Sequence, residues 1–215
     1  MSNIIDGAYS ITYFTYTKLH ELFMEKSYYI GIKYPYKWYE FIHKILSNKK
    51  ITYFKDTTMI VSLLDLELHQ IKILFEILKE YLKDKLIKKV LYHREFIIVH
   101  FHNNKTISMF KSKYLWIAVF SYYMIKNKLS NLDIHLQAVL EYIEHKDIVD
   151  MVINTNNFTY LFSTNKLINI DSENIKLVYI CDKLVNNKTL PPSYNIVKFS
   201  LNQNEFIRNL LKTIL

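Results

Sequence analysis

The pattern of apolar and polar positions along the chain predicts a mixed α/β or α+β protein. Apolar residues at every second position indicate short strands, and apolar residues three or four positions apart indicate helices. The predicted strands cover residues 8–14, 51–54, 58–64, 93–102, 105–110, 158–162, 175–181 and 194–200. The predicted helices, about six, cover residues 17–27, 36–47, 67–89, 113–127, 131–149 and 203–214. Strand–helix units therefore begin the chain.

Two segments carry the strongest local signals. Ser130 and Asp133 suit the start of a helix, and apolar residues from Leu132 to Ile143 trace one helical face, so residues 131–149 are predicted to be helical. A central β-hairpin is predicted over residues 93–110, because Asn103 and Asn104 suit a two-residue turn between apolar strands.

The end of the chain is predicted to form a strand-loop-strand-helix unit. We expect one compact body over residues 1–215, with lobes at 1–150, which is helix-rich, and 151–215, and a soft boundary near Asn154–Asn157. The sequence of Ile11–Phe14 recurs at Ile51–Phe54. Residues 11–50 and 51–90 are therefore either a duplicated strand–helix unit or a chance match in a biased composition.

The composition is strongly biased, with 29 Ile, 26 Lys, 18 Tyr and 18 Asn against 2 Gly and 2 Arg. The abundant residues have AT-rich codons, which indicates an AT-rich genome such as that of a large DNA virus, an organelle or a low-GC microbe. Gly7 and Gly31 cannot supply a phosphate-binding loop, a dinucleotide fingerprint or a G-x-S-x-G elbow. The single cysteine, Cys181, excludes an internal disulfide and a Cys-rich zinc site. We therefore expect no cofactor and no enzyme of those classes.

The chain has no apolar run of about 18 residues that could span a bilayer. Its first residues lack the basic, apolar and small-residue order of a secretory signal. The expectation is a soluble intracellular protein that is not secreted and does not insert into a membrane.

The net charge of +8 is spread almost evenly along the sequence. It amounts to +3 for residues 1–50, +1 for 51–100, +1 for 101–150 and +3 for 151–215. Nucleic-acid proteins usually concentrate their cations and use Arg, whereas nearly all the cations here are Lys. Charge by itself is therefore a weak indicator of nucleic-acid binding in this chain.

The first candidate site interleaves aromatic and cationic residues in Lys33, Tyr34, Tyr36, Lys37 and Trp38. Single-stranded nucleic acid needs this combination, because bases stack on rings while ammonium groups follow the phosphates. In the alternative interpretation, Trp38 and the apolar residues after it form the core face of a helix.

The second candidate site is Asp65, Glu67 and His69. If the preceding strand continued through this segment, the three side chains would share one face and could start a metal-dependent nuclease. Alternatively, Asp65 caps the following helix and the three side chains diverge.

Three further signals are weaker. His100 and His102 supply only half a zinc site, so we expect a solvated hairpin tip and no metal. Cys181 suits a small buried side chain. The basic residues 79–94 and the acidic residues 131–150 are complementary in charge, within the molecule or across a subunit contact.

Taken by itself, the sequence favours a non-enzymatic binding or assembly protein that acts through a protein partner or as a homo-oligomer, because aromatic residues are plentiful and no catalytic motif is present. The alternatives are single-stranded nucleic-acid binding through residues 33–39 and a metal-dependent hydrolase or nuclease that uses Asp65, Glu67 and His69.

Overall fold

The computed structural model describes residues 2–5, 9–111, 113–142, 145–164, 167, 168, 170, 172–181 and 193–215. The chain forms two compact units, which we name unit 1 and unit 2. Unit 1 combines the two ends of the chain, Met1–Thr15 and Ile117–Leu215, and unit 2 is the segment between them, Tyr16–Trp116. The boundary predicted near Asn154–Asn157 lies inside unit 1, in the turn between two of its strands.

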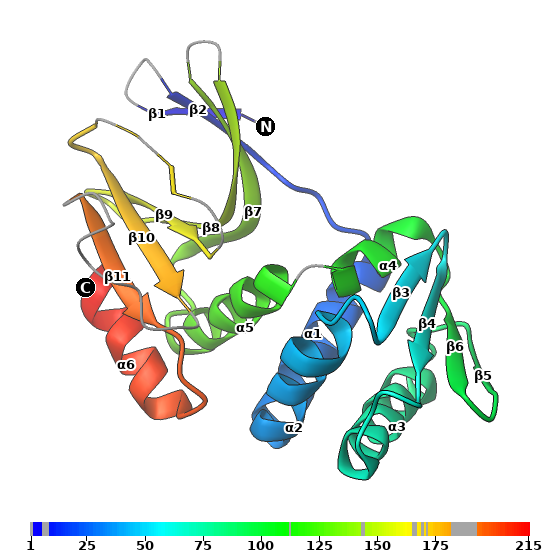
Figure 1. Cartoon of the computed structure of the whole chain (residues 1–215). Helices are drawn as coiled ribbons and strands as arrows, with labels where there is room; N and C mark the ends of the chain where they lie inside the picture. Colours follow the sequence, from blue (N-terminus) through cyan, green and yellow to red (C-terminus); the bar gives the residue numbers. More distant parts are fainter. Residues whose placement is uncertain are drawn as a thin grey trace. The chain divides into compact units, whose positions relative to one another are not determined.

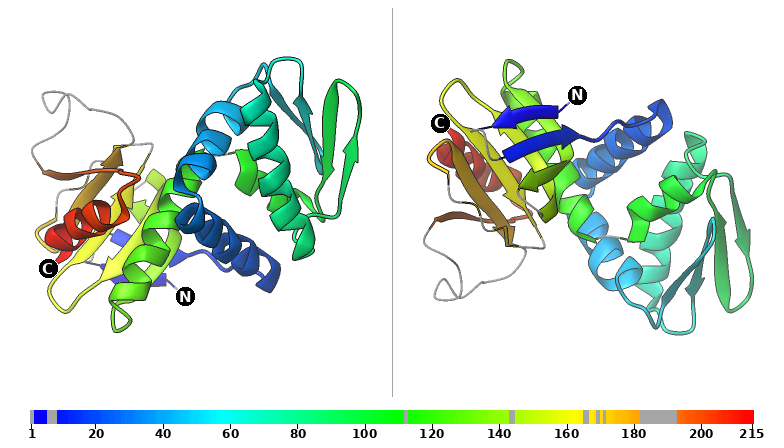
Figure 2. Two further views of the ribbon diagram at one scale, coloured as in Figure 1. Left: turned by 90° about the horizontal axis from the view of Figure 1, so that it is seen from below. Right: turned by 90° about the horizontal axis from the view of Figure 1, so that it is seen from above.

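Unit 2 has helices on one face of a four-stranded antiparallel sheet (Figures 1 and 2). The strand order is β3-β4-β6-β5. Its elements are α1 (Lys18–Lys33), α2 (Pro35–Glu40), the π-helix η1 (Phe41–Leu46), β3 (Thr52–Lys55), β4 (Thr58–Ser62), α3 (Leu68–Lys83), β5 (Lys89–Tyr92), β6 (Phe96–His100) and α4 (Asn104–Lys111).

Aromatic rings form the centre of the core of unit 2. The ring of Phe110 lies 4.9 Å from those of Phe23 and Phe101, 5.5 Å from that of Tyr81 and 5.6 Å from that of Trp116. On the sheet, every second residue of β4 and β6 points into this core, including the fully buried Met59, Val61, Ile97 and Val99. The alternation follows from the period of a strand and leaves the other face of the sheet turned outward.

Unit 1 contains a seven-stranded mixed sheet, of order β1-β2-β7-β8-β9-β10-β11. β9, β10 and β11 run parallel to one another, and the other neighbours are antiparallel. Its elements are β1 (Ser2–Ile5), β2 (Tyr9–Tyr13), α5 (Lys113–Lys128, whose first turn belongs to unit 2), β7 (Asp133–Tyr142), β8 (His145–Asn154), β9 (Thr159–Ser163), β10 (Ile175–Cys181), β11 (Tyr194–Lys198) and α6 (Gln203–Ile214).

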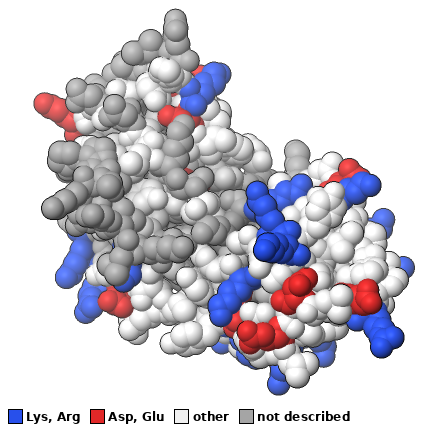
Figure 3. Space-filling view, viewed as in Figure 1, with Lys and Arg blue, Asp and Glu red and all other residues white. Residues whose placement is uncertain are grey.

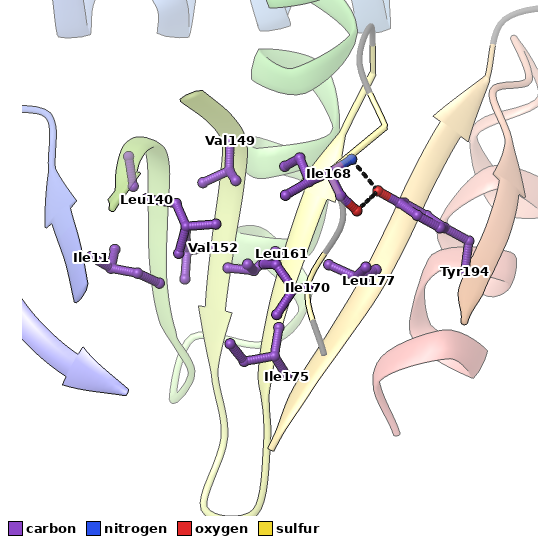
Figure 4. Packing of buried hydrophobic residues seen from close by; sticks show 11 residues of the cluster. Ile11, Leu140, Val149, Val152, Leu161, Ile168, Ile170, Ile175, Leu177 and Tyr194 are labelled. Atoms are coloured by element: carbon purple, nitrogen blue, oxygen red, sulfur yellow. Dashed lines mark hydrogen bonds between the residues drawn. The ribbon is translucent and has the colours of Figure 1, made fainter. Parts of the chain in front are cut away.

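An aliphatic cluster covers one face of this sheet, as Figure 4 shows. Ile11, Leu140, Val149, Leu161 and Leu177 reach it from five neighbouring strands. The hydroxyl of Tyr194 donates to the carbonyl of Ile168 and accepts from its backbone N–H, so β11 fixes the position of residue 168 over the sheet.

The mixed α+β class predicted from the sequence is confirmed, with six α-helices among the described residues. The helix predicted over residues 131–149 is wrong, because β7 and β8 form a long antiparallel pair there. The apolar residues of this segment fit the period of a strand as well as that of a helix. The strands are favoured because β7 also pairs with β2 and β8 also pairs with β9, so both edges of each strand form backbone hydrogen bonds.

The hairpin predicted over residues 93–110 is also wrong. β6 pairs with β4 and β5, and residues 104–111 are helical. Asn103 does not form a turn; its side-chain oxygen accepts from the Thr106 N–H at 2.9 Å and caps α4. The repeated tetrapeptides lie in different units, at Ile11–Phe14 in unit 1 and Ile51–Phe54 in unit 2. The elements that follow them also differ, because helices α1, α2 and η1 follow the first and strand β4 and helix α3 follow the second.

The aromatic core yields a test of unit 2. Phe110→Ala should destabilise the protein by about 3 to 5 kcal/mol, because the cavity would face five other aromatic rings. Chemical denaturation followed by tryptophan fluorescence measures this change, since Trp38 and Trp116 both lie in this core. Tyr36→Ala is the control, because Tyr36 is 76% exposed and its loss should cost less than about 0.5 kcal/mol. Equal unfolding midpoints for the two variants would contradict the assigned core.

Candidate functional site

The predicted segment Lys33 to Trp38 spans the end of α1 and the start of α2. Tyr36 is 76% exposed, whereas Trp38 is only 2% exposed and packs edge-on against Trp116. Lys33 Nζ lies 5.0 Å from the centre of the Tyr34 ring. The segment therefore divides: Trp38 belongs to the core, as the alternative interpretation has it, and the lysines and tyrosines lie at the surface.

Carboxylates of α3 neutralise much of this surface. Lys37 Nζ lies 2.6 Å from Glu76, and Lys26 Nζ lies 2.6 Å from Glu80 and 2.8 Å from Asp84. The hydrogen bond from Lys26 lowers the pKa of Glu80. In the space-filling view, positive and negative side chains are mixed over unit 2 (Figure 3). A polyanion would meet repulsion as well as attraction here.

The second predicted site falls in a turn and the start of α3, and no strand continues through it. His69 lies between two carboxylates, with Nε2 2.9 Å from Glu40 and Nδ1 3.2 Å from Glu67. Asp65 accepts a hydrogen bond from Ser62 at 2.8 Å. The structure thus brings Glu67 and His69 together, adds Glu40 to them, and turns Asp65 toward Ser62.

Both ring nitrogens of His69 are engaged by carboxylates, so neither is available as a base or a metal ligand in this arrangement. Asp65 and Glu67 still line an open hollow of about 620 Å³. Over the described part of the chain, no group of three or more His, Cys, Asp or Glu could hold a metal ion. The metal-dependent hydrolase remains a prediction.

The predicted histidine pair is split between two environments. His100 lies on β6, with Nδ1 3.3 Å from the Thr58 hydroxyl. His102 lies beyond the strand and donates from Nε2 to the Lys85 carbonyl at 3.0 Å.

The outward face of the unit 2 sheet, which we name the cationic sheet face, brings together residues from all four strands. The strand register places Tyr53, Ile60, Ile98 and Leu91 in one row across the sheet and Lys55, Thr58, His100 and Lys89 in the next. Ser62 and Phe96 form a third row. None of these residues is acidic, and the described helices of unit 2 lie against the other face (Figure 2).

Aromatic and cationic side chains are accessible on the cationic sheet face. Tyr53 is 59% exposed, and Phe96 stacks on His93 with ring centres 4.5 Å apart. Lys55 and Lys89 are exposed, and no carboxylate lies within ion-pair distance of either in the described residues. Unlike the lysines beside α3, these two are available to an outside anion.

The two units differ in net charge. Unit 2 contains 18 Lys and Arg against 10 Asp and Glu, whereas unit 1 contains 10 of each. The whole excess of +8 therefore belongs to unit 2. A compositional bias acts on both units equally, so it does not by itself explain this difference.

Unit 1 holds a partly buried carboxylate, that of Asp150, at an irregular point of its sheet. Gln137, which the register places opposite Asp150, has a positive φ of 57°. Val149 and Val152 both face the aliphatic cluster although they are three residues apart, so β8 changes face between them. Backbone irregularity of this kind is often found beside functional sites.

The Asp150 carboxylate is fixed by the residue that follows β9. Its Oδ2 accepts from the Thr164 N–H at 2.7 Å and from the Thr164 hydroxyl at 2.8 Å. Burial raises the pKa of Asp150, while these two hydrogen bonds oppose the shift. The carboxyl ends of parallel strands are where open α/β sheets commonly place their sites, and Thr164 and Cys181 lie at the ends of β9 and β10.

Sequence reasoning identified neither the cationic sheet face nor Asp150. Tyr53, Lys55 and Lys89 come from strands far apart in sequence, and only the register shows that they share a face. Asp150 directly follows the segment that was wrongly predicted to be helical. Burial alternates between half-buried and buried residues along β4 and β6, but these strands are apolar on both faces at their centres, so their sequences carry no local signal for the outward face.

The comparisons give a distant likeness in fold. No known protein family matches the sequence, and no curated protein matches it. Protein VC1899 from Vibrio cholerae has a similar structure, with a TM-score of 0.53 and 11% identity over 95% of this chain and 58% of that one. Can2 from Sulfobacillus thermosulfidooxidans, solved with cyclic tetra-adenylate, has a TM-score of 0.47, 11% identity and the same coverage.

The chain thus spans 58% of the length of each of these structures. At 11% identity, the likeness to VC1899 concerns the fold alone. Among the described residues, no helix has the length and apolar character needed to cross a membrane.

The raised pKa of Asp150 leads to a prediction about pH. A carboxyl that binds its proton more tightly in the folded state stabilises the protein while protonated, and this stabilisation is lost as pH rises through the raised pKa. Asp150→Asn keeps an acceptor for both Thr164 hydrogen bonds and cannot ionise. The variant should therefore lose less stability than the wild type as the pH rises above the ordinary pKa of an Asp carboxyl.

Thermal unfolding at several pH values measures this difference. Glu141→Gln is the control, because Glu141 is an exposed carboxylate on β7 that pairs with Lys146. Parallel pH profiles for the wild type and Asp150→Asn would show that Asp150 does not titrate as its burial implies.

Proposed function

We propose that unit 2 binds single-stranded nucleic acid through the cationic sheet face. The observation that carries the proposal is the combination on one open face of the exposed ring of Tyr53, half-buried aliphatic side chains and unpaired lysines. A carboxylate, that of Asp65, contacts this face at Ser62 in the third row, away from the row of Lys55 and Lys89. Rings accept bases by stacking, and ammonium groups attract phosphates.

The form of the surface favours a single strand over a duplex. A sheet face with accessible rings and aliphatic side chains offers contacts to unstacked bases, which a duplex keeps inside. The rows of the cationic sheet face differ in the side chains that they present. Tyr53 begins the aliphatic row, and Lys55 and Lys89 lie at the two edges of the next row, so bases and phosphates would meet different rows.

The charge of the two units supports the same conclusion. The excess of cations in unit 2 raises the local concentration of a polyanion around it, and neutral unit 1 does not oppose this effect. The surface predicted from the sequence, Lys33 to Lys37, is less suited, because Glu76 already pairs with Lys37. It remains a candidate for secondary contacts.

Reversal of the two lysines tests the proposal. The double variant Lys55→Glu, Lys89→Glu should bind short single-stranded DNA or RNA at least about tenfold more weakly at low salt, because two phosphate contacts become repulsive. The salt dependence should also become shallower, by roughly 0.7 in the logarithmic slope for each phosphate that is no longer neutralised. Fluorescence anisotropy with labelled oligonucleotides at several salt concentrations measures both quantities.

The matched control is Lys18→Glu, Lys72→Glu. It changes the net charge of unit 2 by the same amount at helical positions away from the sheet. If wild-type protein shows no binding at low salt, or if both double variants lose affinity equally, the cationic sheet face is not the site.

Stacking is tested separately. Tyr53→Ala should weaken binding by about 1 to 3 kcal/mol, since one base would lose its aromatic partner. This loss should persist at high salt, because stacking does not depend on counterion release. Tyr92→Ala is the control: Tyr92 is 57% exposed but faces the opposite side of the sheet, where it stacks on Phe75. A loss for Tyr53→Ala that disappears at high salt would argue against stacking.

Self-association is the competing explanation for an open sheet face, and it corresponds to the protein interface favoured by the sequence. Light scattering with and without oligonucleotide separates the two. If the wild type is a dimer that Tyr53→Ala converts to a monomer, and if no oligonucleotide binds, the open face is a homo-oligomeric interface and the proposal is wrong.

A further inference from the structure

A polar network joins four strands at one end of the unit 1 sheet. Asn154 on β8 donates from its amide nitrogen to Asp133 at 2.7 Å and to the Tyr13 hydroxyl at 2.9 Å. Its amide oxygen accepts from Thr159 on β9 at 3.2 Å. On β7, His135 Nε2 donates to the other Asp133 oxygen at 2.7 Å, and its ring stacks on that of Tyr13 at 3.6 Å.

This network fixes the direction of the Asp133 carboxylate. Oδ1 receives one hydrogen bond from His135 and Oδ2 receives one from Asn154. Each oxygen of a carboxylate can accept two hydrogen bonds, so each retains one further acceptor position. The side chain is 57% exposed, and these two positions are therefore accessible from outside. The two oxygens of Asp133 are therefore fixed in direction and can each accept a hydrogen bond from one of two neighbouring hydroxyl groups.

A hollow of about 690 Å³ lies beside this carboxylate. Residues 131–133, 154–158, Tyr160 and 214–215 line it. Asn156 and Asn157 at the tip of the β8–β9 turn are exposed, and within the part of the chain that the structure describes their side chains make no hydrogen bond. The half-buried Phe158 supplies aromatic surface, whereas Tyr160, with its ring centre 6.3 Å from that of Phe158, is only 8% exposed. Lys176 Nζ lies 4.6 Å from the centre of the Phe158 ring, so a ligand has to use the rest of that ring.

The charge of the lining restricts the class of ligand. Asp133 is its one ionisable side chain apart from the phenol of Tyr160, and no Lys or Arg is among the described residues that line the hollow. Asp133 would therefore repel a phosphate or carboxylate that approaches its two acceptor positions, and the nearest cation, Lys176, lies at the Phe158 ring rather than beside Asp133. Amides both donate and accept, a carboxylate accepts, and aromatic rings cover apolar C–H surface. These groups together suit a neutral ring that bears adjacent hydroxyls.

We propose that this hollow binds a neutral sugar ring, with adjacent hydroxyls donating to Asp133, the amides of Asn156 and Asn157 contacting further hydroxyls, and the ring packing against Phe158. The ring could belong to a free saccharide or to the ribose of an uncharged nucleoside, because both present vicinal hydroxyls. The site is independent of the cationic sheet face, which lies in unit 2 and attracts anions.

Saturation-transfer NMR on the full chain tests this inference. One arm uses methyl glycosides of common hexoses, and the other compares uridine and adenosine with their 2′-deoxy forms. At least one arm should give ring-proton signals, and Asp133→Ala should weaken that binding at least about tenfold, because the paired acceptor is removed. Transfer to the ribonucleosides but not to the deoxynucleosides or glycosides would assign the ring as ribose.

Two variants separate binding from folding. Asn157→Ala removes an exposed amide that makes no hydrogen bond within the described chain, so it should weaken binding while leaving the melting temperature unchanged. Glu141→Ala removes a carboxylate from the other end of the same strand and should leave binding intact. No transfer from either arm at tens of millimolar, or equal transfer with Asp133→Ala, would overturn the proposal.

Discussion

The antiparallel pairing of β2 with β7 is the constraint on which the rest of the structure depends. It joins Tyr9–Tyr13 to Ala138–Tyr142 and so brings the first residues of the chain into a sheet built mainly from its second half. The chain between β2 and α5 must therefore leave this sheet and return to it. The entropic cost of closing such a long loop is moderate because it grows only with the logarithm of length. The intervening chain, however, requires a core of its own.

Unit 2 meets this requirement with aromatic side chains. Phe110 touches rings from α1, α3, η1 and the segment after β6, so one residue links most of its layers. The helices bury the inner face of the sheet and leave the outer face open. Because both the core and the outer face follow from the same two-residue period, the register that packs Met59 and Val99 inside also aligns Lys55 with Lys89 outside.

Local patterns in the sequence predicted elements well where a single period was present. The stripe of Phe206, Leu210 and Ile214 fits only a helix, and α6 lies where it was predicted. Residues 131–149 fit two periods, and the choice depended on β2, a strand more than a hundred residues away. Asn103 suits either a turn or a helix cap. It is a cap because α4 follows it, and α4 is held in place by its buried residues Ile107 and Phe110. Such choices depend on partners that no local window contains.

The same limit applies to function. Lys, Tyr and Asn are abundant throughout this chain, so their number in any segment says little about binding. Their placement is more informative, because a bias in composition cannot choose the face of a strand or the partner of a side chain. Lysines that face Glu76 and Glu80 are neutralised, whereas those on the cationic sheet face are not. Asparagines gather beside Asp133 around a hollow whose described lining has no cation. The fold places lysines without carboxylate partners on one surface and asparagines around a carboxylate on another, and this separation is the physical reason to propose different ligands for the two units.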